Sequence, residues 1–368
     1  MQMRRGQQCS RSYIKKKWEG ERTMNKRIIT ILILITWLFH ITAPAYANTA
    51  TLQTEQSVKH QMVISTIQDI STVLQKNNPH PKPGSTSGEW LILGLARSDM
   101  DVPNTYYDIY YRALETIVKE KQGVLHKRKY TEYSRTVLAL ASIGKDPGNV
   151  AGYNLLQPLE DVKAAVQQGI NGAIFALLAL DSNMYESDAR QQYVSYILER
   201  ELPNGGWALS GNQADLDVTA MAVQALAPYS EDVSVQKAIE RAMNFLSTAK
   251  IVYCESAAQL LIAMTTLGMD TTAVESVLDT LMAFYQQGKG FTHTLDGKVN
   301  AMATEQALHA LVAVERYYDG DKTLYDMTVV PGDATLQDGV NEPVTDAKTI
   351  SVLQTILNKL NEFWRKGA

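Results

Sequence analysis

Leu91-Ile92-Leu93-Gly94-Leu95-Ala96 is the first copy of a short pattern that decides the fold of this chain of 368 residues. In the pattern, two apolar residues are followed by any residue, a small residue, an apolar residue and any residue. It occurs six times, and the small residues fall at Gly94, Ala139, Ala179, Ala225, Ala263 and Ala310. Their spacings are 45, 40, 46, 38 and 47 residues. A period in the forties with helical composition indicates a repeat of two helices.

The six repeated stretches and the segments between them predict two kinds of helix. The stretches are apolar nearly all round and rich in alanine, which is typical of a helix buried on every side. The intervening segments are amphipathic, as in Val235, Ile239, Ala242 and Leu246, which recur at helical spacing with charged residues such as Glu240 on the other face. We therefore expect an all-α fold in which about six helix-pair repeats each supply one inner and one outer helix.

The repeats extend over residues 89–326. Residues 48–88 are expected to form an N-terminal helix followed by a loop, because Pro79, Pro81 and Pro83 interrupt any regular structure there. Residues 327–368 are expected to form an irregular linker and a last amphipathic helix over 346–365. Nothing in the sequence predicts an extended β domain.

The N-terminus has the three parts of a secretory signal peptide in order. Lys26 and Arg27 form a basic region, residues 28–39 are almost all apolar, and Ala45-Tyr46-Ala47 is a cleavage site of small residues. We expect residues 24–47 to be removed between Ala47 and Asn48, and we interpret residues 1–23 as a mistranslated leader. The alternative is that the apolar run stays as an uncleaved membrane anchor.

Charge and cysteine content agree with an exported protein. Residues 1–47 hold nine Lys and Arg and two Asp and Glu, so the remainder has 26 basic and 37 acidic residues and a net charge of −11. Such a balance argues against nucleic acid or an anionic membrane as partner. Only Cys254 lies beyond the signal peptide, so no internal disulfide is expected. We expect a secreted or extracellular protein without a stable membrane span after cleavage.

Two segments resemble known motifs. Residues 201–207, Glu-Leu-Pro-Asn-Gly-Gly-Trp, resemble the QxxxGxW repeat of squalene and terpene cyclases, with Glu201 in place of Gln. Residues 215–220, Asp-Leu-Asp-Val-Thr-Ala, are similar to their DxDDTA segment. Over about residues 85–326 the chain resembles secreted Gram-positive prenyltransferase/squalene-oxidase-repeat proteins. That likeness is carried by Glu89-Trp90, residues 94–98, 129–135, 152–156, 175–182, 291–297 and 302–307.

The resemblance implies an α/α toroid, the fold shared by terpene cyclases and protein prenyltransferases, with a ligand cavity at one mouth of its inner barrel. Cobalamin carriers share this toroid but close a small β domain over their ligand. This sequence has no such domain, and no cofactor is expected.

A class II cyclase requires a carboxylic acid that can protonate an alkene, and the matching residue here is Asp217, flanked by Asp215. Val218 stands where the motif has its last Asp, so the group that tunes the acid is missing. The alternative is structural: Asp215 caps a helix and Asp217 lies in its first turn, where the helix dipole favours negative charge.

A zinc site like that of protein prenyltransferases would need Asp217, Cys254 and His293 to converge from separate repeats. Their spacing matches no short zinc motif, and no metal site is expected. The sequence also lacks the GxSxG, HExxH, GxGxxG and P-loop motifs. His309 lies inside a repeated apolar stretch and is interpreted as a core residue.

Polar and aromatic residues near the starts of the inner helices form the candidate binding set. A toroid would bring these starts to one rim, where carboxylates, amides and aromatic rings suit a small polar or cationic ligand. The alternative is that the polar residues cap their own helices. The candidates are Trp90, Tyr133, Asn171, Trp207, Glu255, His293, Asn300, Thr304 and Glu305.

The sequence therefore predicts a non-catalytic, secreted or cell-surface ligand-binding module. Its partner would be a small polar or cationic ligand or a cell-surface component. The alternative is a divergent class II terpene cyclase with Asp217 as general acid. We also expect Glu255 and Glu305 to face a common mouth and raise each other's pKa.

Overall fold

A computed structural model describes residues 56–328 of the chain. The expected leader, signal peptide and cleavage site, and the expected helix over 346–365, lie outside the described residues. The chain divides after Gln61 into two units. The description below concerns the described part of the second unit, residues 62–328.

Each of the six repeated stretches lies in a helix or ends one residue beyond it. These helices are α2 (Glu89–Arg97), α4 (Thr131–Ser142), α6 (Ile170–Asp181), α8 (Leu216–Leu226), α10 (Cys254–Thr266) and α12 (Ala301–Asp319). They are buried nearly all round, as their composition predicts: every residue of α10 except Thr266 is buried. The expected all-α class is confirmed, and residues 62–77 are helical as well.

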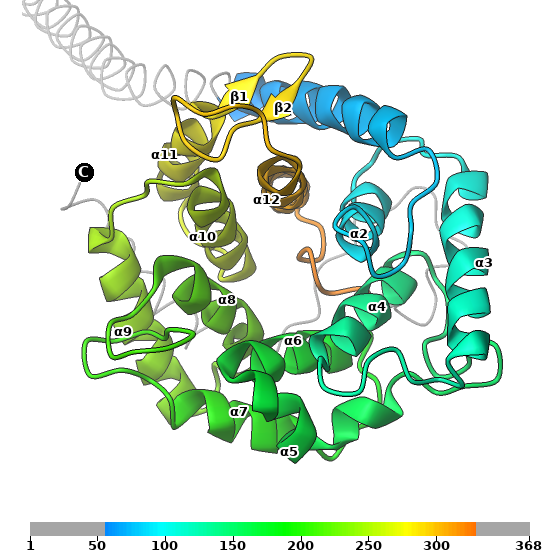
Figure 1. The fold of residues 1–368 in the computed structure, drawn as a ribbon. Helices are drawn as coiled ribbons and strands as arrows, with labels where there is room; N and C mark the ends of the chain where they lie inside the picture. The colour runs from blue at the N-terminus through cyan, green and yellow to red at the C-terminus, as the bar shows by residue number, and fades with distance from the viewer. Residues whose placement is uncertain (1–55, 329–368) are drawn as a thin grey trace, which may run out of the picture. The chain divides into compact units, whose positions relative to one another are not determined.

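The helices between them pack on the outside of this set (Figure 1). They are α3 (Asn104–Glu120), α5 (Val162–Ala165), α7 (Arg190–Leu198), α9 (Val233–Thr248) and α11 (Thr271–Met282). In α9 the expected apolar face is buried through Val235, Ile239, Ala242 and Leu246. The short 3-10 helices are η1 (Gln157–Glu160), η2 (Val166–Gln168) and η3 (Ala227–Tyr229), and β1 (Tyr285–Gln286) pairs antiparallel with β2 (Gly290–Phe291).

The inner helices contact one another in chain order. Each of α2, α4, α6, α8 and α10 packs against the next in the series, and α12 packs against both α10 and α2. The contact between α12 and α2 depends on Gly94, because a Cβ atom there would lie 2.8 Å from Leu308 Cδ2 and 2.9 Å from His309 Cδ2. A small residue in the repeated pattern thus permits the close approach of two helices.

The segment after α12 crosses to the ends of other inner helices. The Arg97 guanidinium, at the end of α2, donates hydrogen bonds to the carbonyl oxygens of Thr323, Leu324 and Asp326 at 2.8 to 2.9 Å. Met327 N–H donates to the carbonyl oxygen of Ser182, just past α6, at 2.6 Å. Residues 323–328 therefore form a strap, which we call the mouth strap, at the C-terminal ends of α2 and α6. None of the described helices has the length and apolar character needed to cross a membrane.

Candidate functional site

Neighbouring inner helices begin at the same end of the structure. An ion pair of 3.3 Å between Arg135 Nε of α4 and Glu89 Oε2 of α2 joins two of these starts. Gln259 Nε2 of α10 donates to Gln306 Oε1 of α12 at 3.1 Å, and both are the sixth residues of their helices. The chain direction therefore places the starts of these helices together, and we call this end the rim.

Five residues meet on the rim where α8 and α10 begin: Asp217, Tyr253, Glu255, Ser256 and His293, which we call the rim cluster. His293 Nδ1 lies 2.8 Å from Glu255 Oε2. The rings of Tyr253 and His293 are stacked, with centroids 4.4 Å apart and planes 11° from parallel. Ser256 donates a hydrogen bond to Asp217. Asp217, Glu255 and His293 were expected here from the sequence, whereas Tyr253 and Ser256, which flank Glu255 closely in sequence, were not.

The rim cluster combines buried and exposed groups. The Glu255 side chain is 10% exposed, whereas that of His293 is 49% exposed. Tyr253 is also exposed, so both of the stacked rings have surface that a ligand can contact. Burial raises the pKa of Asp217, and Asp215 and Glu255 raise it further, while the bond from Ser256 and the nearby His293 lower it. The cluster thus offers hydrogen-bond acceptors beside a flat aromatic face.

Asp215 caps a helix, which was the structural alternative to a catalytic role. It is exposed and forms the N-cap of α8, where its side chain accepts a hydrogen bond from Val218 N–H at 3.0 Å. Asp217 stands in the first turn of the same helix and is half-buried. The two candidate catalytic carboxyls therefore differ, because only Asp217 belongs to the cluster.

Cys254 does not face the other two residues of the zinc hypothesis. Its side chain is fully buried, and its thiol lies 3.8 Å from the carbonyl oxygen of Ala303 on α12. Burial raises the pKa of the thiol, so the thiolate that zinc requires is disfavoured. Among residues 56–328 no group of three His, Cys, Asp or Glu side chains is placed to hold a metal ion.

Trp207 and Thr304 were expected on the rim as ligand-binding residues, and the structure corrects both. Trp207 is fully buried and its indole N–H donates to the carbonyl oxygen of Ile197 at 2.7 Å. Thr304 is 2% exposed, accepts from Phe291 N–H at 2.9 Å and donates to the carbonyl oxygen of Asn300 at 2.8 Å. Neither side chain is available to a ligand.

Trp207 and Thr304 are buried for the same reason, because one kind of turn occurs both before α8 and before α12. Before α8, Trp207 N–H donates to Thr219 Oγ1 at 2.9 Å, just as Phe291 N–H does to Thr304 before α12. The glycine preceding each aromatic residue has a positive φ, 105° at Gly206 and 122° at Gly290. The resemblance to the QxxxGxW repeat therefore lies in a structural turn that fixes the aromatic residue against the next inner helix.

The last three candidate binding residues lie on or beside inner helices, with Tyr133 on α4, Asn171 on α6 and Asn300 just before α12. Asn300 is the N-cap of α12, and its Oδ1 accepts from Met302 and Ala303 N–H. Tyr133 is 3% exposed and packs on Tyr130, at 5.7 Å between centroids. Asn171 is half-buried on α6, and its Oδ1 is buried without a hydrogen-bond partner. Asn300 thus caps its own helix, which was the alternative to binding a ligand.

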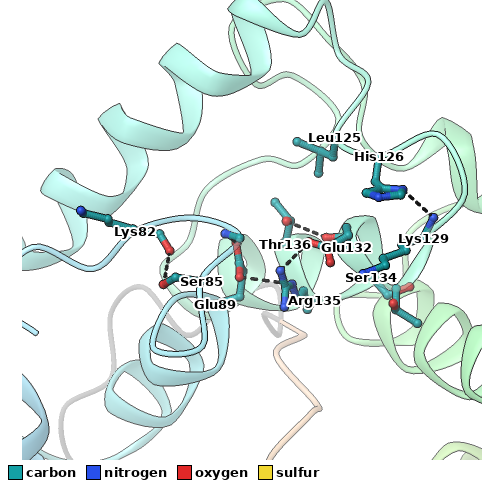
Figure 2. A network of polar contacts seen from close by, with 12 residues as sticks. Lys82, Ser85, Glu89, Leu125, His126, Lys129, Glu132, Ser134, Arg135 and Thr136 are labelled. Carbon is teal, nitrogen blue, oxygen red and sulfur yellow. Dashed lines mark hydrogen bonds and ion pairs between the residues drawn. The ribbon is translucent and has the colours of Figure 1, made fainter.

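A network of charged residues, drawn from two of the stretches that carry the resemblance but not expected to interact, links α2 to α4 (Figure 2). Glu89 is 1% exposed, accepts from Gly84 N–H at 2.8 Å and pairs with Arg135, which also pairs with Glu132. Burial raises the pKa of Glu89, while Arg135 opposes that shift. A Glu in the first turn of an apolar helix was the available signal for this residue.

Glu305 is buried and does not interact with Glu255 as expected. It is 3% exposed, its Oε1 has no hydrogen-bond partner, and burial raises its pKa to about 7, with only a bond to Ser87 opposing the shift. Glu255 pairs instead with His293. The expectation that the two carboxyls raise each other's pKa is therefore wrong for Glu305, where burial is the cause.

The Trp90 side chain contacts aromatic rings on two other inner helices. Its ring lies 5.5 Å from that of Phe175 on α6 and 5.9 Å from that of His309 on α12. His309 is buried, as expected of a core residue, and its Nε2 lies 2.7 Å from the carbonyl oxygen of Trp90. Burial lowers the pKa of His309 to about 4, so the ring is neutral at pH 7.

Comparison with protein-family models, curated proteins and solved structures gave no match for this chain. The assignment of a function therefore depends on the residues and their geometry.

Proposed function

We propose that the chain is an exported, non-catalytic ligand-binding protein with an α/α toroid of about six helix-pair repeats, related to the prenyltransferase/squalene-oxidase-repeat group. The contacts that run from α2 to α12 and back to α2 support the toroid. So does Gly94, whose missing side chain lets α12 approach α2.

The ligand of the rim cluster would be a sugar or another polyol. The observation that carries this assignment is the exposed stack of Tyr253 on His293 beside the carboxyl group of Glu255. The C–H face of a sugar ring packs on a flat aromatic ring, which offers a large contact area at a low entropic cost. Ligand hydroxyls would donate to carboxylate oxygens in charge-assisted hydrogen bonds.

The test is a glycan-binding screen of the purified chain followed by calorimetric titration with the sugar selected. We expect Tyr253→Ala to weaken binding of that sugar by about tenfold or more, the size expected for loss of an aromatic contact. Leu209→Ala is the matched control, because Leu209 is 61% exposed and lies on the loop before α8. A sugar that binds equally to both variants would refute the assignment to the rim cluster.

The second candidate is a divergent class II terpene cyclase, and the raised pKa of Asp217 favours it. A cyclase acid should face a dry apolar cavity, yet Asp217 is half-buried on the rim and accepts a bond from Ser256. Incubation with squalene or geranylgeranyl diphosphate and gas chromatography would test this candidate. A cyclic product that Asp217→Asn abolishes would replace the binding function with catalysis.

A further inference from the structure

A cavity of about 590 Å³ lies at the end of the inner helices opposite the rim. Its walls come from the ends of α6, α8 and α10, from the start of α7 and from the mouth strap. This volume is within the range of small-molecule sites. Its lining includes Asp181, Met184, Arg190, Gln224, Ala227 and Tyr229.

The charged groups on the wall formed by α6 and α7 are already paired with each other. Asp181 Oδ1 accepts from Arg190 Nε at 2.6 Å, and Tyr229 OH donates to the same carboxyl group at 2.9 Å. Arg190 also donates to the carbonyl oxygens of Leu180 and Tyr185. An ionic ligand would have to displace these bonds, so this wall favours an uncharged ligand.

Gln224 supplies a hydrogen-bonding group that is unused. It is 2% exposed, and its Nε2 donates to the backbone carbonyl oxygen of Gln259 at 2.9 Å. Because a carbonyl oxygen can only accept, this bond fixes which end of the amide is nitrogen. The other atom, Gln224 Oε1, is buried without a partner. A buried acceptor without a donor is costly, and a donor on a ligand would relieve that cost.

The cavity also has a way in from solvent. Met184, which follows α6 and lines the cavity, is 70% exposed. The mouth strap covers another side and is held by the bonds from Arg97 and to Ser182 described above. Met184 therefore gives the lining of the cavity an edge that is open to solvent.

We propose that this cavity is a second binding site, which takes an uncharged and largely apolar molecule that donates one hydrogen bond to Gln224 Oε1. An alcohol, a phenol or a secondary amide has this chemistry. The site differs from the rim cluster in position, lining residues and ligand class.

Three naphthalene probes test the proposal by fluorescence titration of the full chain at pH 7. The probe 2-naphthol is uncharged and donates one hydrogen bond, its methyl ether donates none, and 2-naphthoate is anionic. We expect 2-naphthol to bind with one site per chain. The ether should bind about three- to tenfold more weakly, because the loss of one neutral hydrogen bond has an effect of this size. Naphthoate should bind least, because its charge would have to displace the existing ion pair.

Two variants identify the site. Gln224→Leu removes the acceptor and should bring the affinity ratio of naphthol to ether close to one. Ala227→Phe places a large side chain on the wall and should abolish binding of both probes. Its helix content and melting temperature are measured to establish that the variant is folded. Tyr253→Ala, which alters the rim cluster only, should leave naphthol binding unchanged.

The proposal is overturned if 2-naphthol fails to bind, if the ether binds as tightly as naphthol, or if folded Ala227→Phe binds both probes like the original chain. None of these results depends on sugar binding at the rim, so the two sites can fail separately.

Discussion

The two ends of the inner helices differ in the bonds that their charged side chains make. The rim carries carboxyl groups in the first turns, as in Glu89, Asp217 and Glu255. At the other end, arginine side chains bond to backbone carbonyl oxygens, as Arg97 does on the mouth strap and Arg190 does at the end of α6. Helix starts carry partial positive charge and unpaired N–H groups, whereas helix ends carry partial negative charge and unpaired C=O groups.

The parallel direction of the inner helices therefore separates two chemistries in space. It gives the rim acceptors for a polar ligand, and it uses the cations of the other end to satisfy backbone carbonyls. What remains open at that end is an apolar cavity with one unused amide oxygen.

Trp207→Ala should have the largest effect on stability. The side chain is fully buried and its N–H is hydrogen bonded, so truncation leaves a cavity and should lower the free energy of unfolding by about 3–5 kcal/mol in urea denaturation. Trp90→Ala is the control, because Trp90 is only partly buried and should cost less. Equal costs for the two variants would contradict the structural role of the Gly-aromatic turn.

Glu305→Gln should stabilise the protein at high pH. Burial raises the pKa of Glu305 from 4.5 to about 7 in the folded state, so the folded protein holds this proton more tightly than the unfolded chain does. Stability contributed by this group falls as pH rises from about 4.5 to about 7 and stays low above that. The variant should gain about 2–3 kcal/mol relative to the original chain at pH 8 and little at pH 4.

Unfolding in urea at several pH values measures this difference. Asp232→Asn is the matched control, since Asp232 is exposed at the N-cap of α9 and its pKa is lowered rather than raised. A difference between the Glu305 variant and the original chain that does not change with pH would show that the pKa of Glu305 is the same in the folded and unfolded protein.

Gly206→Ala tests the same turn by adding a side chain to the glycine that precedes Trp207. A Cβ atom there would lie 2.6 Å from Thr219 Oγ1, and the backbone has a φ of 105°. Gly211→Ala is the control, because Gly211 also has a positive φ but has no atom within 4 Å of the added Cβ. The Gly206 variant should lose about 1–3 kcal/mol more than the Gly211 variant in thermal and urea unfolding. Equal losses would mean that only backbone strain matters.

The helices could be predicted from the sequence because the repeated apolar pattern has a period that only packed helix pairs explain. Part of the rim cluster could also be predicted, since Asp217, Glu255 and His293 are polar residues near helix starts. Trp207 was misplaced because a motif that resembles a cyclase repeat looks the same in sequence whether its aromatic ring faces a ligand or the core. Thr304 was misplaced because a polar residue near a helix start can bond to the backbone of a turn as readily as to a ligand. Only burial and bonding partners distinguish the two.

The cavity at the far end could not be predicted, because its walls come from three helix ends and from a strap without periodicity. One signal was present. The third position of the six-residue pattern is leucine or isoleucine in four copies, but Gln224 and His309 occupy it in the other two. Those two polar residues contact neighbouring inner helices, as the bonds to Gln259 and Trp90 demonstrate. A polar residue at an apolar repeat position was therefore a better guide than the motif.

Glu255→Gln should have the smallest effect on stability and a clear effect on binding. Its contact with His293 Nδ1 involves a side chain that is 49% exposed, and exposed contacts of this kind contribute about 0–1 kcal/mol. Gln keeps the shape and one acceptor oxygen, so the melting temperature should move little. The variant loses the negative charge that strengthens hydrogen bonds from ligand hydroxyls, and it should bind the rim ligand about tenfold more weakly. It should bind 2-naphthol as the original chain does, because Gln224 lies at the other end. A variant that loses several kcal/mol, with its response to the sugar unchanged, would make Glu255 a structural residue and leave the far cavity as the binding site of this protein.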